Sequence, residues 1–156
     1  MKLTQAIALA YIHDVTRRGA MFSINGGDSW MNHGGLAEAL AKHSHGLDPR
    51  VDGNTAFDEG SDVPEFHASV KSHKATLTTK PLAGSTFEEK LADYFRRVAS
   101  TEFWWVEFGA GTVTIYKMDA AKFAEFAKRF AFLTCYGVIR FRGSSSKMLA
   151  WLEANC

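Results

Sequence analysis

Residues 61–72, with the sequence SDVPEFHASVKS, concentrate side-chain types that can act on a phosphodiester. Side chains alternate between the two faces of a strand, so one face would carry four polar groups: Glu65, His67, Ser69 and Lys71. Asp62 stands just before them. Carboxylates bind hard divalent cations, and a nearby lysine can position water or balance phosphate charge. We interpret this face as a candidate hydrolytic site. The alternative is a solvent-facing edge strand whose lysine protects it from further pairing.

The arrangement resembles the PD-(D/E)XK, or restriction-endonuclease-like, nuclease superfamily, over residues of about 35–116. Members carry an Asp at a strand start and an acid-x-Lys sequence on the next strand. Asp62 matches the first acid, and Ser69-Val70-Lys71 stands for acid-x-Lys. Members often add a Glu from a preceding helix, and Glu38 on the expected helix 35–45 matches that role.

The resemblance implies a DNA-cleaving site that uses Mg²⁺ or Mn²⁺. Glu38, Asp62 and Glu65 would hold the metal, and Lys71 would activate the attacking water. Ser69 occupies the place of the second acid, so the sequence departs from the family pattern. Either Glu65 supplies the missing carboxylate, or metal binding is lost.

A second chemical motif is Arg140-Phe141-Arg142-Gly143-Ser144-Ser145-Ser146-Lys147. The two arginines would share one face of a strand, and the serines would begin the last helix, where free N–H groups favour anions. This stretch predicts a phosphate contact. Together with the earlier lysines it gives the candidate nucleic-acid-binding residues: Lys71, Lys74, Arg140, Arg142, Ser144 and Lys147. The alternative is an ordinary serine helix cap beside solvated arginines.

Composition limits these readings. The chain has 156 residues, of which 46% are hydrophobic, which predicts one domain with a real core. The net charge is 18 − 17 = +1, so any nucleic-acid contact must come from a local patch. The cysteines, Cys135 and Cys156, form no disulfide framework or metal-type pair, which favours a reducing, cytoplasmic location. No apolar run reaches membrane-spanning length, so we expect no membrane partner.

The periodic patterns predict the elements that must position these residues. Helices are expected at 3–17, 35–45, 85–100, 118–133 and 144–154, and strands at 65–72, 75–79, 102–108, 112–118 and 137–142. Ser85 and Asp119 are the expected helix caps. Trp104 and Trp105 would send one indole to each face of the sheet. The order predicts a single α/β or α+β domain over 1–156: a mixed sheet flanked by helices, with residues 119–156 packed on the core.

Three functions are consistent with these residues. The first is a metal-dependent DNA endonuclease of phage or mobile-element type. The second is an inactive protein of the same fold that binds DNA, or binds a host defence nuclease as an anti-CRISPR inhibitor does. The third is a plain interaction domain. The sequence leaves the oligomeric state open, a homodimer included.

Overall fold

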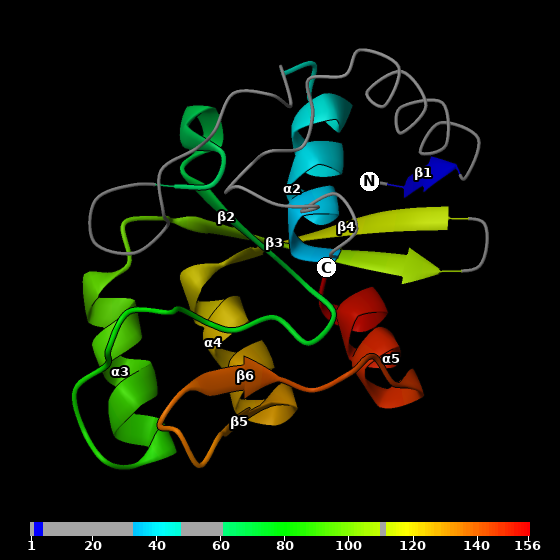
Figure 1. The fold of residues 1–156 in the computed structure, drawn as a ribbon. Helices are drawn as coiled ribbons and strands as arrows, with labels where there is room; N and C mark the ends of the chain where they lie inside the picture. The colour runs from blue at the N-terminus through cyan, green and yellow to red at the C-terminus, as the bar shows by residue number, and fades with distance from the viewer. Residues whose placement is uncertain (1, 5–32, 48–60, 110–111) are drawn as a thin grey trace.

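A mixed β-sheet organises the computed structural model, which describes residues 2–4, 33–47, 61–109 and 112–156. Its strands are β1 (Lys2–Thr4), β2 (Ala68–Ser72), β3 (Glu102–Gly109) and β4 (Thr112–Asp119), in the order β1-β4-β3-β2. Strand β2 runs parallel to β3, whereas β3 with β4 and β4 with β1 are antiparallel (Figure 1). The expected mixed sheet in a single α+β domain is therefore confirmed.

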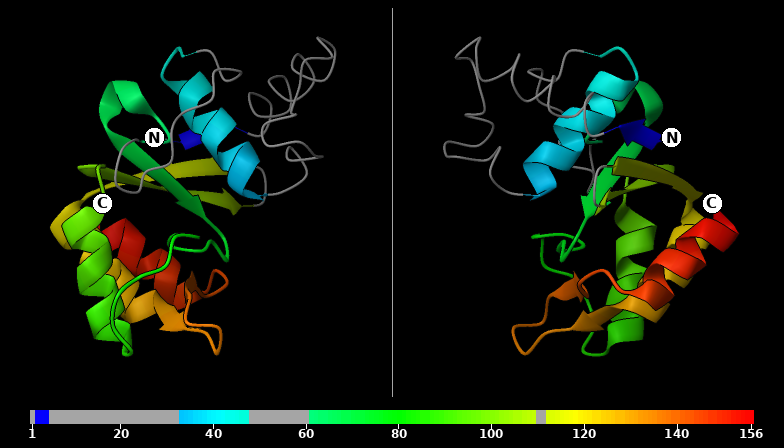
Figure 2. Two further views of the ribbon diagram at one scale, coloured as in Figure 1. Left: turned by 60° about the vertical axis from the view of Figure 1, so that its left-hand side comes forward. Right: turned by 90° about the vertical axis from the view of Figure 1, so that its right-hand side faces the viewer.

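Helices cover both faces of this sheet (Figure 2). Helix α2 (His33–Ser44) packs on one face. The other face carries α3 (Phe87–Arg97), α4 (Ala120–Phe130) and α5 (Ser146–Asn155). A small antiparallel sheet of β5 (Ala131–Leu133) and β6 (Ile139–Phe141) lies beside these three helices. A 3₁₀ turn, η2 (Pro64–Phe66), precedes β2.

The main core lies between the sheet and the three-helix side. Phe103 of β3 stacks on Phe123 of α4 with ring centroids 4.4 Å apart, and Trp105 meets Phe126 edge-on at 4.9 Å. All four side chains are fully buried, and each such burial stabilises the fold by roughly 1.5–3 kcal/mol. The alternation of buried aromatic residues along β3 and α4 is thus what holds helix and sheet together.

Trp104 faces the opposite way and stacks on His45 at the end of α2, with ring centroids 4.4 Å apart. The prediction that the two indoles separate to opposite faces is confirmed. Both are buried, because α2 and Phe66 cover the second face.

Several local predictions are confirmed. Strands β3 and β4 form the expected hairpin, and α2 spans most of the expected helix 35–45. Asp119 caps α4 by accepting the N–H of Lys122 at 2.8 Å. The cap of α3 is Thr86 and not the expected Ser85, because the Thr86 hydroxyl accepts the N–H of Glu89.

Other local predictions are wrong. Residues 131–133 form β5 instead of extending α4, because this segment pairs with β6. Residues 2–4 pair with β4 as a strand, and the rest of the expected helix 3–17 lies outside the described residues. Of the expected strand 75–79, only Thr76 makes a bridge, to Arg140 of β6.

Candidate nucleic-acid interface and the Asp62–Lys71 site

Asp62 is brought beside β2 by a very short hairpin. Val63 and Ala68 exchange backbone hydrogen bonds, with N···O distances of 3.0 and 3.2 Å, and η2 makes the turn between them. His67 completes the turn in the left-handed region, at φ 48°. The first acid and the lysine-bearing strand thus meet within one compact hairpin.

The carboxylate of Asp62 is held by two donors from β2. Its Oδ2 accepts the Val70 N–H at 2.7 Å and the Ser69 hydroxyl at 3.1 Å. Ser69 is fully buried and Asp62 is half-buried. These bonds fix the start of β2, so Asp62 has a structural role whatever else it does.

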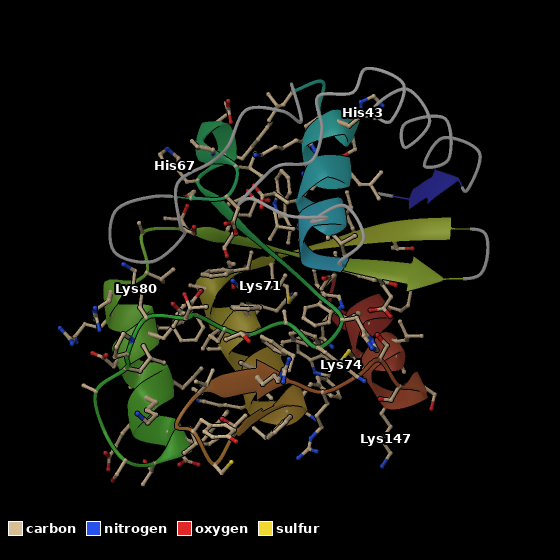
Figure 3. The ribbon with its side chains drawn as sticks, viewed as in Figure 1. His43, His67, Lys71, Lys74, Lys80 and Lys147 are labelled. Carbon is tan, nitrogen blue, oxygen red and sulfur yellow. The ribbon has the colours of Figure 1, made fainter. Side chains whose placement is uncertain are left out.

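Ser69 and Lys71 face the three-helix side of the sheet. Their parallel partners are Phe103 and Trp105, whose side chains point into the main core. Tyr94 of α3 lies close to Ser69 there, and burial raises the pKa of its hydroxyl, as does the negative charge of Asp62. Lys71, the next-to-last residue of β2, is half-buried (Figure 3). An acid and two hydroxyls therefore gather near the start of β2, and Lys71 lies two residues further along the same face.

The other expected carboxylates lie elsewhere. Glu65 and His67 were expected on the face of Ser69, but η2 and the left-handed His67 take both out of the strand, and both are exposed. Glu38 pairs with Lys42 at 2.9 Å on α2, which covers the opposite face of the sheet. Within the described ranges, Asp62 is the single acid at this point.

A Mg²⁺ site does not fit the described donors. Mg²⁺ prefers octahedral oxygen ligands, commonly one or two carboxylates with waters and substrate phosphates. Here Oδ2 of Asp62 already accepts two hydrogen bonds, and the described residues place no second carboxylate in a metal-binding group with it. Among the residues that the structure describes, no group of three or more His, Cys, Asp or Glu side chains could hold a metal ion.

The second motif, residues 140–147, contacts the turn at residues 73–74. His73 Nδ1 accepts the backbone N–H of Ser144 at 3.2 Å, and the Ser144 hydroxyl lies 3.3 Å from the same atom. The Nε–H of Arg140 donates to the carbonyl of Lys74 at 3.3 Å. Gly143 is packed so closely here that an added Cβ would lie 3.2 Å from the His73 ring and 3.4 Å from Cε of Lys74.

These contacts create one surface from two distant segments, which we call the basic surface: His73, Lys74, Arg140, Arg142, Ser144 and Lys147. Arg140 and Arg142 alternate with the buried Ile139 and Phe141, so the prediction that they share one exposed face is confirmed. Figure 3 shows Lys74 beside the connection between β6 and α5, and Lys147 lies in the first turn of α5.

Local charge on these segments is strongly positive, although the net charge is only +1. No acidic residue occurs at 66–87, and none occurs between Glu125 and Glu153. The second of these stretches carries five basic residues: Lys128, Arg129, Arg140, Arg142 and Lys147. Such a patch attracts polyanions even when the whole molecule is nearly neutral.

Two features prearrange the cations. The guanidinium of Arg142 lies 4.9 Å from the ring centroid of Phe132, which limits its motion. Lys74 is held in the left-handed region at φ 56°, in a turn closed by the Ala75 N–H bond to the Ser72 carbonyl at 3.0 Å. A left-handed lysine is strained, and such strain is concentrated at functional positions.

Sequence reasoning missed His73, whose partner Ser144 is 71 residues away. It also gave Ser144 a direct anion contact, whereas both its backbone N–H and its hydroxyl face His73. The cap of α5 is Ser145, which accepts the N–H of Met148 at 3.2 Å.

Comparison with known proteins adds no assignment, since no family model, curated protein or solved structure matches the chain. Across the described segments, no helix has both the length and the apolar character needed to cross a bilayer.

Proposed function

We propose that this protein binds DNA through the basic surface, on a restriction-endonuclease-like scaffold that has lost its second catalytic acid. The observation that carries the proposal is the joining of residues 73–74 to residues 140–147 through His73, Ser144 and Arg140. Their contacts bring the exposed Arg140 against the backbone of Lys74 and the connection at Gly143 against the Lys74 side chain.

The binding mechanism is electrostatic. Lys74, Arg140, Arg142 and Lys147 contact backbone phosphates and release condensed counterions, so affinity falls as salt rises. With these cations engaged, the slope of log K against log salt is about −3 to −4. His73 and Ser144 act as positioning residues that hold the two halves of the surface together.

The test is the salt dependence of DNA binding by wild type and two matched lysine variants. Lys147→Ala removes a cation from the basic surface, whereas Lys80→Ala removes one from the α3 side of the molecule (Figure 3). We expect Lys147→Ala to weaken binding several-fold at low salt and to make the slope shallower by about 1. Lys80→Ala keeps wild-type affinity and slope. Equal losses in both variants, or no binding by wild type at low salt, would contradict the proposal.

A second candidate is a Mg²⁺- or Mn²⁺-dependent endonuclease, and the hairpin that brings Asp62 beside Ser69 on the strand of Lys71 supports it, although the described donors alone do not complete a metal site. Cleavage of plasmid and linear DNA should then require the metal and be lost in both Asp62→Ala and Lys71→Ala. Failure of the pure wild-type protein to cut DNA with either metal rejects this candidate and leaves DNA binding untouched.

A further inference from the structure

The hairpin between β5 and β6 ends in an unusually exposed aromatic residue, Tyr136, which has 90% of its surface in solvent. The turn beneath it is well ordered by hydrogen bonds. The Thr134 carbonyl accepts the Gly137 N–H at 3.0 Å, and the Thr134 N–H donates to the Val138 carbonyl at 2.9 Å. The Thr134 hydroxyl accepts the Val138 N–H at 3.2 Å. Cys135 and Tyr136 are therefore the exposed residues at the tip of a hydrogen-bonded turn.

The fold does not require a tyrosine at this position. Gly137, at φ 77°, supplies the left-handed residue that such a three-residue hairpin loop needs. The preceding turn position accepts small polar residues readily. A ring that stays almost wholly in water contributes little to folding and is free to contact an external partner.

The tip continues the basic surface. Arg140 and Arg142 lie on the exposed face of the same hairpin, and Arg140 follows Tyr136 by four residues, just past the turn. Lys90 of α3 also lies near the tip, because its Nζ would be 3.9 Å from a Cβ added to Gly137. An exposed aromatic ring with cations nearby is the combination by which proteins hold single strands.

We infer that Tyr136 stacks on an unpaired base, so that the protein selects single-stranded DNA, or single-stranded segments, over duplex. This inference rests on the proposed DNA-binding function. Bases of a duplex are already stacked on their neighbours, and their faces are closed to a surface ring. A single strand offers a free face to the ring while its phosphates reach Arg140 and Arg142.

The experiment measures fluorescence anisotropy with a labelled oligothymidylate and with a duplex of equal length, at one fixed salt concentration. Wild type should bind the single strand more tightly. Tyr136→Ala should lose about tenfold on the single strand and leave duplex affinity unchanged. Tyr136→Phe keeps the ring and should retain wild-type affinity. Cys135→Ala, at the adjacent tip position, is the matched control and should change neither affinity.

The outcomes separate the two proposals. Lys147→Ala should weaken both forms of DNA alike, because a phosphate contact does not distinguish them. If Lys147→Ala weakens binding but Tyr136→Ala does not, stacking is rejected and the basic surface stands. If wild type binds neither form, both proposals are rejected. Because Tyr136 is so exposed, Tyr136→Ala should fold normally, which circular dichroism checks directly.

Discussion

The hydroxyl of Ser69 donates to Oδ2 of Asp62 at 3.1 Å, across the hairpin that begins β2. In a metal-dependent nuclease, the acid at the place of Ser69 would meet the first acid through a shared cation. Here a neutral hydroxyl satisfies the carboxylate directly, and no cation is needed to keep the two groups together.

Replacing that hydroxyl with a carboxylate should therefore create a need for metal. Ser69→Asp places two like charges in contact at a fully buried position, which should lower the free energy of unfolding by on the order of 3 kcal/mol without divalent cations. Mg²⁺ or Mn²⁺ should restore much of that loss in thermal melts and leave wild type unchanged. Ser69→Ala, the control, should lose about 1 kcal/mol with no response to metal. An equal metal-induced rise in the Tm of wild type would mean that a metal site already exists.

Two substitutions of Lys74 should separate its effect on DNA binding from its effect on the free energy of unfolding. Lys74→Gly and Lys74→Ala both remove the cation and should weaken DNA binding equally. Only glycine relieves the left-handed backbone at φ 56°, so Lys74→Gly should be more stable than Lys74→Ala by about 1 kcal/mol. Chemical denaturation measures that difference. Equal stabilities of the two variants would show that this turn carries no strain.

Asp93 on α3 should make part of the free energy of unfolding depend on pH in the acid range. Its carboxylate accepts the Ala83 N–H at 2.9 Å and pairs with Arg96 and Arg97, so the pKa of Asp93 falls from 3.8 to about 2. The folded state therefore binds this proton more weakly than the unfolded chain. The stabilisation is complete above pH 3.8 and is lost as pH falls toward 2.

Asp93→Asn should accordingly be less stable than wild type at neutral pH. The difference in free energy of unfolding between the two proteins should become smaller as pH falls from 3.8 toward 2. Urea midpoints measured across the acid range test this directly. A constant gap at every pH would mean that the asparagine loses only packing or hydrogen bonds that do not depend on charge.

The His45 side chain should contribute to stability, whereas the His43 side chain, at the same end of α2, should not. Its ring covers the buried Trp104, so His45→Ala should lower the free energy of unfolding by about 1–2 kcal/mol. His43 is exposed, and His43→Ala should stay within about 0.5 kcal/mol of wild type. Denaturant titration followed by tryptophan fluorescence compares the two. Similar losses in both variants would argue against a special role for the stack.

Elements with strong local signals could be predicted from the sequence. The β3–β4 hairpin follows from two alternating strands around a glycine turn, and Asp119 marks the start of α4 through its own side chain. The secondary structure of residues 131–133 could not be predicted from such local signals. They continue a helical pattern, but the partner strand β6 draws them into a sheet.

The candidate sites depend even more on contacts between distant residues. Arg140 and Arg142 could be placed on one face from alternation alone. The contact of Ser144 with His73 could not, because it spans 71 residues. The 3₁₀ turn that removes Glu65 from the strand also had a local cue, since Pro64 lacks the N–H that a regular strand would use. The exposure of Tyr136 had only a weak cue, an aromatic residue before the glycine of a short turn.

The two halves of the basic surface are joined by a narrow backbone seam. The Leu77 N–H donates to the Ile139 carbonyl at 2.9 Å, and the Phe141 N–H donates to the Ala75 carbonyl at 2.8 Å. A local opening that breaks these bonds would separate the halves while the β3–β4 hairpin stays paired. Amide hydrogen exchange at Leu77 and Phe141 should then slow when a ligand bridges the seam. Binding of a ligand to the basic surface would thus keep these two hydrogen bonds formed for a larger fraction of the time.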